Sequence, residues 1–389
     1  MFLFAHNVIF YKFFKNLDHK APEPRIFFQN YTGKSYLNTR AIMLSTMVWF
    51  LSSGHEFVQQ MYCKFYHSAA LDNSVLIGYT KNMQDYAFIP SYLHLPPGVL
   101  SDKVREAEKI LRECTLCPRN CKVDRTSGEK GFCKTGDKPF ISSHGAHFGE
   151  ENPLVGRFGS GAIFMGHCNL GCIFCQNYSI SHMGEGVEVS FEKLADIMLS
   201  LQKEGCHNIN LVTPTHQMPM ILKSLLIASE KGLKLPIVYN CGGYESLHAL
   251  EILDGVVDIY MPDFKYMDPA MALQYSKAEG YPEAAKAALK EMHRQVGDLL
   301  IDKRGIALRG LLIRHLVLPG GIAGTSEAVK FIAAEISRNT YINIMDQYHP
   351  CYKAFNNPPL DRRITTQEYS EAIELAEEAG LTRIDGVTI

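Results

Sequence analysis

The chain has 389 residues, of which 46% are hydrophobic and 21% charged, a composition typical of a globular protein with a large core. A formal net charge of -2 without a basic block gives no signature of nucleic-acid or anionic-membrane binding. The longest apolar stretch, 41–53, is shorter than the roughly 20 residues that a membrane span needs. We therefore expect no nucleic-acid partner, no membrane segment and no signal peptide.

Residues 1–82 differ from the rest of the chain. They are dense in Phe, Tyr and Met, and neither helical nor strand periodicity continues for long. Either they form a small accessory domain, or translation begins downstream at Met61 or Met83, which we favour. We expect three parts: an extension of unknown role at 1–82, a helix with a four-cysteine segment at 83–150, and a main domain at 151–389.

From residue 101 onward, helical periodicity alternates with short apolar runs. The predicted helices are 101–113, capped by Ser101 or Asp102, then 190–204, 218–231, 245–253, a helical insertion at 269–298, 325–337, and a last helix from the capping box Thr365-x-x-Glu368 to Gly380. The predicted strands are 161–165, 208–213, 236–240, 256–261, 311–318 and 341–345. This alternation predicts an α/β fold of parallel βα units, either an open sheet or a barrel.

Three cysteines follow the first predicted strand directly, at positions 168, 172 and 175. Three thiolates on one short loop can bind three irons of a 4Fe–4S cubane and leave the fourth iron open, as a catalytic centre requires. Phe174 can pack over such a cluster and limit the access of water. The alternatives are three buried structural cysteines, or a zinc site completed by His167 or His182.

A second set of cysteines lies upstream, with the spacing C-x2-C-x3-C-x11-C at Cys114, Cys117, Cys121 and Cys133. Four thiols can close a site completely, so this set predicts either structural zinc or an auxiliary iron–sulfur cluster that passes electrons or anchors a substrate. The spacing does not choose between them, and unmetallated structural cysteines are the remaining alternative. Clustered thiols require a reducing compartment, which indicates the cytoplasm.

The C-x3-C-x2-C motif resembles the signature of the radical S-adenosylmethionine (radical SAM) superfamily. Within it, about 88–385 resemble the PflX-type, predicted pyruvate formate-lyase activating enzyme-like proteins. The resembling segments are 114–123, 166–181, 205–216, 257–266, 291–298, 309–321 and 343–350. The resemblance implies an α/β fold, a partial (β/α)6 barrel with an N-terminal cysteine-rich extension.

The resemblance also implies the chemistry. S-adenosylmethionine would chelate the open iron through its amino and carboxylate groups. An electron from the reduced cluster would cleave the sulfonium, leaving methionine and a 5′-deoxyadenosyl radical that takes a hydrogen atom from the substrate, while the protein supplies position and shielding. Such an enzyme needs an electron donor such as flavodoxin or ferredoxin.

The cofactor-binding residues are carried over by position. The GGE-type motif usual after the second strand is replaced by Thr213-Pro-Thr215, whose hydroxyls could accept from an ammonium group, although an ordinary turn is an equal alternative. After the fourth strand, Asp263 and Lys265 resemble a DxK motif that would bind the ammonium and carboxylate of the methionine; otherwise they form an ordinary ion pair.

Three further residues complete the expected cofactor site. Arg314, inside the apolar fifth strand, must be paired if it is buried, and it resembles a carboxylate- or ribose-binding arginine. His349 resembles a histidine that approaches the adenosyl group, and Asn240 ends the third strand at the same edge. We assign no catalytic residue beyond the cluster.

Four functional hypotheses follow. The leading one is a radical SAM enzyme that activates a glycyl radical enzyme by taking a glycyl hydrogen, and the second is a radical SAM enzyme acting on a small molecule. A non-catalytic electron carrier with two clusters would lack a pocket for S-adenosylmethionine. A zinc-bearing binding module would be colourless when purified without air.

Overall fold

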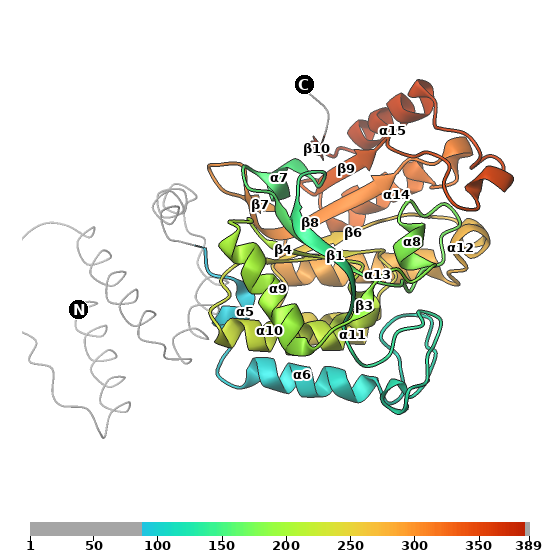
Figure 1. Cartoon of the computed structure of the whole chain (residues 1–389). Helices are drawn as coiled ribbons and strands as arrows, with labels where there is room; N and C mark the ends of the chain where they lie inside the picture. The colour runs from blue at the N-terminus through green and yellow to red at the C-terminus, as the bar shows by residue number, and fades with distance from the viewer. Residues whose placement is uncertain (1–87, 386–389) are drawn as a thin grey trace, which may run out of the picture. The chain divides into compact units, whose positions relative to one another are not determined.

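A mostly parallel β-sheet forms the centre of the computed structural model, which describes residues 88–385 (Figure 1). The predictions for residues 1–82, including a start at Met61 or Met83, lie outside the described residues. The sheet follows the order β10-β9-β8-β6-β5-β4-β2-β1-β3, with β7 paired to β8. All neighbours from β2 to β10 in this order run parallel, which confirms an α/β fold of the partial-barrel type.

The six predicted strands are all present. They correspond to β2 (Ser160–Met165), β4 (Ile209–Val212), β5 (Ile237–Cys241), β6 (Ile259–Pro262), β8 (Ala307–Leu316) and β9 (Tyr341–Met345). Four strands were not predicted, namely β1 (Phe140–His147), β3 (Val187–Glu188), β7 (Leu300–Ile301) and β10 (Arg383–Asp385). The parallel strands are mainly apolar and buried because helices cover their outer face.

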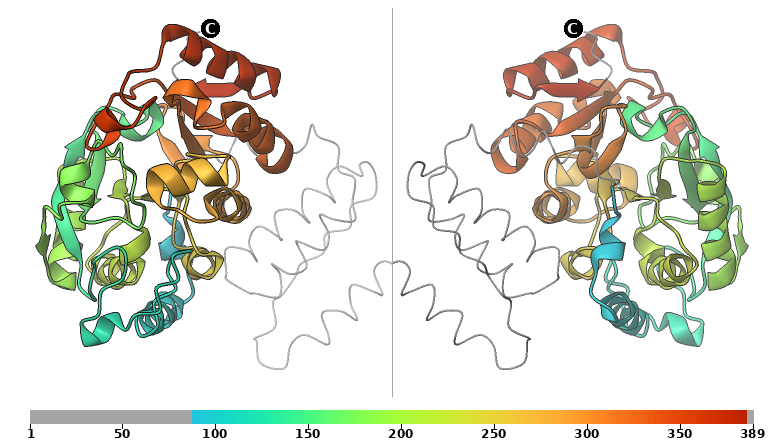
Figure 2. Two further views of the ribbon diagram at one scale, coloured as in Figure 1. Left: turned by 90° about the vertical axis from the view of Figure 1, so that its right-hand side faces the viewer. Right: turned by 90° about the vertical axis from the view of Figure 1, so that its left-hand side faces the viewer.

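Helices pack around the outside of the curved sheet, as the side views show (Figure 2). They are α5 (Ser91–His94), α6 (Val99–Ile110), α7 (Asn152–Val155), α8 (Tyr178–Ser181), α9 (Phe191–Lys203), α10 (Met218–Glu230), α11 (Leu247–Leu253), α12 (Pro269–Ser276), α13 (Tyr281–Val296), α14 (Thr325–Phe331) and α15 (Thr366–Glu378). Short helical turns lie at Arg125–Ser127, Thr215–Gln217, Pro319–Gly321, Ile332–Ile336 and Ala354–Asn356.

The capping signals in the sequence explain where several helices begin. The Ser190 hydroxyl accepts from the backbone N–H of Lys193 at the start of α9. Thr365 and Glu368 form the predicted capping box at the start of α15. Because these side chains replace missing backbone partners, both helices begin at the predicted residues.

Several helix boundaries differ from the prediction, and the predicted helical insertion 269–298 is divided into α12 and α13. The first long helix starts at Val99 rather than after Ser101, because Gly98 provides a left-handed turn with φ of 88° and the Ser101 hydroxyl donates to the Gly98 carbonyl. The predicted helix 325–337 is α-helical only over Thr325–Phe331, and Ile332–Ile336 form a π-helical turn.

The antiparallel strand β1 joins the cysteine-rich segment to the main sheet. It pairs with β2 along most of its length, from Ile141 opposite Met165 to His147 opposite Ser160. The sheet is therefore continuous across residue 150, where the sequence analysis places a division. None of the helices between residues 88 and 385 has the length and apolar character that crossing a bilayer requires.

Candidate active site

The three predicted cluster cysteines lie on the loop that connects β2 to α8. Gly166 begins this loop, and its N–H donates to the carbonyl of Phe140 on β1. The N–H of Gly171 donates to the carbonyl of Ser276 at the end of α12, which fixes the middle of the loop. Cys168, Cys172 and Cys175 are each partly buried. These two backbone hydrogen bonds hold the loop between β1 and the end of α12.

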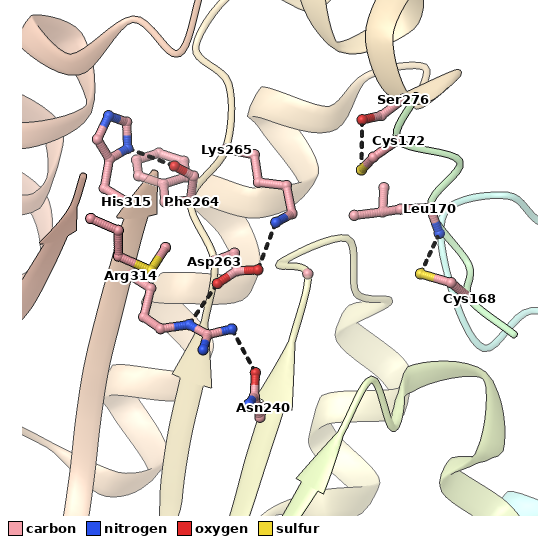
Figure 3. Close-up of polar contacts among 12 residues, drawn as sticks. Cys168, Leu170, Cys172, Asn240, Asp263, Phe264, Lys265, Ser276, Arg314 and His315 are labelled. Carbon is pink, nitrogen blue, oxygen red and sulfur yellow. Dashed lines mark hydrogen bonds and ion pairs between the residues drawn. The ribbon is translucent and has the colours of Figure 1, made fainter. Parts of the chain in front are cut away.

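Each of the three sulfur atoms accepts a hydrogen bond from the protein. The Leu170 N–H lies 3.3 Å from Cys168 Sγ, and the Ser276 hydroxyl lies 2.9 Å from Cys172 Sγ (Figure 3). The Ser181 hydroxyl lies 3.1 Å from Cys175 Sγ. Such donors stabilise thiolate ligands and tune the potential of an iron–sulfur cluster, so the donor set fits a 4Fe–4S cluster.

A polar network lies at the same edge of the sheet, where β5, β6 and β8 end. The Arg314 guanidinium donates to Asp263 at 2.7 Å and to the Asn240 side chain at 2.8 Å. Lys265 Nζ lies 2.6 Å from the other carboxylate oxygen of Asp263 (Figure 3). The structure therefore brings together four residues that the sequence placed inside, at the end of, or just after three different strands.

The charges in this network are mutually stabilised. Burial acts to raise the pKa of Asp263, but Arg314 and Lys265 outweigh it and hold the pKa below its ordinary value. Burial likewise acts to lower the pKa of Lys265, yet Asp263 and the nearby Cys172 raise it. The Lys265 ammonium is thus a permanent positive charge close to the cysteine loop.

The two predicted threonines lie at the end of β4, and only one is buried. Thr213 adopts a left-handed conformation with φ of 62°, and its N–H donates to the Asn240 carbonyl. Thr215 is 1% exposed and its hydroxyl donates to Glu245, at 2.7 Å. The Thr215 hydroxyl is therefore already engaged by a carboxylate of its own chain.

The sequence analysis missed Glu245, which follows β5. It is 3% exposed and also accepts a hydrogen bond from the Tyr239 hydroxyl. Burial raises the pKa of Glu245 to about 7, and its hydrogen bonds from Thr215 and Tyr239 counteract this only in part. The paired glycines Gly242 and Gly243 just before it were the signal that could have revealed a functional turn.

Phe174 is part of the cysteine loop, and His349 lies beside it. Phe174 is buried and makes edge-to-face contacts with Tyr266 and Tyr348. The His349 ring lies 3.3 Å from the side-chain amide of Gln176, the residue after Cys175. The segment after β9 therefore contacts the cluster loop directly. His315, which the strand alternation directs away from Arg314, is fully buried and bonded to the Phe264 carbonyl.

The second cysteine set surrounds a small cavity. Its walls carry all four cysteines together with residues of neighbouring segments: Cys114, Leu116, Cys117, Arg119, Asn120, Cys121, Arg125, Gly131, Phe132, Cys133, Asn169 and His216. Burial raises the pKa of Cys117 to about 12, and the charges of Cys133 and Cys114 act in the same direction. Between residues 88 and 385, no three His, Cys, Asp or Glu side chains are arranged to hold a single metal ion.

Comparisons with known proteins agree with this geometry. Residues 162–301, which include the three cluster cysteines, match the family model described as the radical SAM superfamily. The uncharacterized protein MJ0674 of Methanocaldococcus jannaschii is 31% identical over 300 residues, covering 75% of this chain and 82% of the relative. A second uncharacterized protein of that organism, MJ0808, is 25% identical over 288 residues, covering 69% of this chain and 78% of the relative.

Among solved structures, a radical SAM methyltransferase from Sphaerobacter thermophilus is similar over 58% of this chain and 67% of its own, with 12% identity and a TM-score of 0.39. The chain belongs to the radical SAM superfamily. Membership implies a 4Fe–4S cluster and S-adenosylmethionine as cofactors, and a radical reaction that begins with cleavage of S-adenosylmethionine.

Proposed function

We propose that this chain is a PflX-type radical SAM enzyme that takes a hydrogen atom from a glycyl residue of a protein partner. The carrying observation is that a loop with three cysteines, each with a hydrogen-bonded sulfur, lies at the same sheet edge as the Asp263 network. In this proposal, Cys168, Cys172 and Cys175 hold the catalytic cluster. When bound, the cluster and S-adenosylmethionine together supply a carbon radical.

The network residues have distinct roles in binding S-adenosylmethionine. Asp263, whose pKa stays low, accepts a hydrogen bond from the ammonium group of the methionine part. Lys265 attracts the carboxylate of the methionine part. Asn240 and Asp263 fix the Arg314 guanidinium, so that its remaining donors have a set direction. His349, in the segment after β9, approaches the adenosyl group. Phe174 shields the cluster loop from water.

Glu245 supplies the carboxylate that the Thr213-Pro-Thr215 segment lacks. The Thr215 hydroxyl donates to Glu245 at 2.7 Å. A carboxylate therefore lies next to the end of β4, although Glu245 belongs to the loop after β5. Thr215 and Tyr239 hold Glu245 in place by hydrogen bonds. Glu245 would therefore orient the Thr213-Pro-Thr215 turn and, in its ionised form, accept a hydrogen bond from a bound cation.

A protein partner is favoured by an apolar patch beside the cluster loop, which we call the rim patch: the exposed Tyr178, Met183 and Phe355 with the half-buried Tyr352. Met183 is 65% and Phe355 63% exposed. Tyr178 and Tyr352 stack with ring centroids 5.3 Å apart. The N–H of Lys353 donates to the Ile173 carbonyl, which ties this patch to the cysteine loop. Exposed apolar groups gathered beside a reaction centre are typical of an interaction surface.

The seven clustered thiols support a reducing, cytoplasmic location and a low-potential electron donor such as flavodoxin or ferredoxin. The four-cysteine set is proposed as a second metal site.

A small-molecule substrate is the alternative within the same chemistry. A two-cluster electron carrier would have no use for the buried Asp263 network at the sheet edge.

The experiment begins with anaerobic reconstitution with iron and sulfide, reduction, addition of S-adenosylmethionine, and chromatography for 5′-deoxyadenosine. A Cys168→Ala, Cys172→Ala, Cys175→Ala triple variant is the control. We expect product from the wild type alone. A fully loaded, reducible cluster that neither forms product nor changes its spectrum with S-adenosylmethionine would favour the electron carrier.

The substrate is tested with peptides that carry α-deuterated glycine. Transfer of deuterium into 5′-deoxyadenosine would support the glycyl assignment. In an enzyme that cleaves S-adenosylmethionine, failure of transfer from every glycine peptide would favour the small-molecule alternative. A Met183→Ser, Phe355→Ser variant should lose transfer from the peptide but retain cleavage without it, since the rim patch lies outside the cofactor network.

A further inference from the structure

The four upstream cysteines converge although they span twenty residues of the sequence. Cys114, Cys117 and Cys133 line the same cavity. Cys121 is close to the return segment, where its sulfur accepts from the Phe132 N–H at 3.5 Å. Gly131 makes this approach possible, because a Cβ there would lie 2.8 Å from the Cys121 sulfur. All four thiols therefore face one space.

That space is a cavity rather than a point. A tetrahedral zinc site draws four sulfurs to about 2.3 Å from one ion and leaves no hollow between them. Here the cysteines line a cavity, and no three of them are placed to hold a single ion among residues 88–385. The set also has only one C-x2-C pair, whereas zinc sites commonly use two short-spaced pairs. These features favour a larger, multinuclear group.

The cavity contains a buried side chain that lacks a partner. His216 lines it and is 1% exposed. Its Nε2 lies 2.9 Å from the Gly166 carbonyl and donates to it, while its Nδ1 has no hydrogen-bond partner. Burial lowers the pKa of His216 to about 3, so the ring is neutral. The lining of this cavity therefore includes one buried acceptor that no donor of the protein reaches.

The cavity shares a wall with the loop of the catalytic cluster. The Arg119 guanidinium donates to the carbonyls of Asn169 and Ser276, at 2.9 and 3.1 Å, and its other face covers the Phe132 ring at 3.7 Å. A Cβ on Gly171 would lie 3.0 Å from the Phe132 ring. Arg119 and Phe132, which line the cavity, therefore also contact the loop of the catalytic cluster.

We propose that Cys114, Cys117, Cys121 and Cys133 ligate a second, closed 4Fe–4S cluster that stands next to the catalytic cluster, with Arg119 and Phe132 between them. All four irons have a cysteine, so this cluster has no open position for S-adenosylmethionine. Arg119 and Arg125, both in the cavity wall, offset the negative charge of four thiolates.

The first test is metal analysis of the full chain after anaerobic reconstitution. The wild type should contain about eight iron and eight sulfide atoms, and the Cys168→Ala, Cys172→Ala, Cys175→Ala variant about half of each. In that variant the remaining cluster should be a reducible 4Fe–4S cluster by Mössbauer spectroscopy, with a spectrum that S-adenosylmethionine does not change. A colourless variant with one zinc per chain, or one without metal, would overturn the proposal.

The second test measures the separation of the sites. Fully reduced wild type should show an electron paramagnetic resonance spectrum split or broadened by interaction between two clusters. The spectrum of the triple variant should be simple, as should that of Cys117→Ala, Cys121→Ala, Cys133→Ala, while the solitary Cys206→Ala should match the wild type. A wild-type spectrum equal to the sum of the spectra of the two triple variants would mean that the clusters do not interact, and would contradict the shared wall. Neither test requires cleavage of S-adenosylmethionine, so both are independent of the proposed function.

Discussion

The Arg314 guanidinium and the Asp263 carboxylate lie 2.7 Å apart across the ends of β8 and β6. The N–H of Phe264 also donates to the Arg314 carbonyl, so backbone and side chains fix the same register. Arg314 and Asp263 are 17% and 14% exposed, which makes their pairing more than a surface contact. An ion pair that fixes the register of two parallel strands also fixes where the residues after each strand lie relative to one another.

Replacing the shared carboxylate should test this arrangement. Asp263→Asn leaves Arg314 and Lys265 without their negative partner in a mostly buried site. We expect the free energy of unfolding to fall by about 3 kcal/mol, because removing one member of a buried ion network leaves uncompensated charge. Denaturant unfolding measures this loss. Asp196→Asn, which breaks the exposed pair with Lys231, should cost less than about 1 kcal/mol; equal losses would contradict the prediction.

The hydrogen bond from Ser276 to Cys172 should affect the catalytic cluster. Ser276→Ala removes a donor 2.9 Å from the Cys172 sulfur. Because such donors stabilise the extra electron of a reduced cluster, we expect a more negative reduction potential at unchanged iron content. Redox titration followed by electron paramagnetic resonance measures this potential. Ser229→Ala on α10 is the control, and an unchanged potential in Ser276→Ala would show that the donor is without influence.

Glu245 should make stability depend on pH. Its pKa is about 7 when folded and 4.5 ordinarily, so between these values the folded protein keeps a proton that the unfolded chain loses. Rising pH should therefore lower the free energy of unfolding through this window, by up to about 3 kcal/mol, and have no further effect above it.

Glu245→Gln should remove this dependence. Burial also raises the pKa of Asp258, to about 6, which acts in the same direction. The quantity to compare is therefore the difference between wild type and variant in denaturant unfolding at pH 5 and pH 7.5. A difference that stays constant with pH would mean that Glu245 titrates normally.

Gly243 should be intolerant of any side chain. Its φ is +74°, and a Cβ there would lie 2.5 Å from the Asp263 carbonyl oxygen. Gly243→Ala should thus combine a backbone cost of roughly 1–2 kcal/mol with displacement of Asp263, and should weaken S-adenosylmethionine binding. Gly232→Ala is the matched control, since Gly232 has φ of +94° but nothing within 4 Å of the added Cβ. Equal destabilisation in unfolding and equal affinity by calorimetry would refute the steric argument.

The sequence predicted the parallel part of the sheet because β2, β4, β5, β6, β8 and β9 are nearly continuous apolar runs between amphipathic helices. It missed β1, since its sequence FISSHGAH has few apolar residues and no strict alternation. That strand exists because β2 offers it a partner, and such long-range pairing leaves no local pattern. Likewise, β3 and β7 have two residues each, too few to show a period.

The site was predictable where function dictates spacing or charge. The C-x3-C-x2-C loop and the charged residues Asp263, Lys265 and Arg314 stand out from apolar surroundings, and the structure brings the three charges into contact. Glu245 was not predictable, because its neighbours Thr215 and Tyr239 come from other strands and only the fold reveals its burial. Roles for these residues in binding a cofactor remain predictions.

Arg125 is 1% exposed, and its guanidinium donates to the carbonyls of Gly136 and His216. Gly136 lies just before β1, while His216 lies in the loop after β4, so one side chain spans two regions far apart in the sequence. A lysine has a single ammonium at the end of a flexible chain and could not reproduce this planar set of donors. The cysteine-rich segment and the sheet edge are therefore constrained to evolve together: a segment exchanged from a distant relative would fit only if its arginine and the receiving loop still matched.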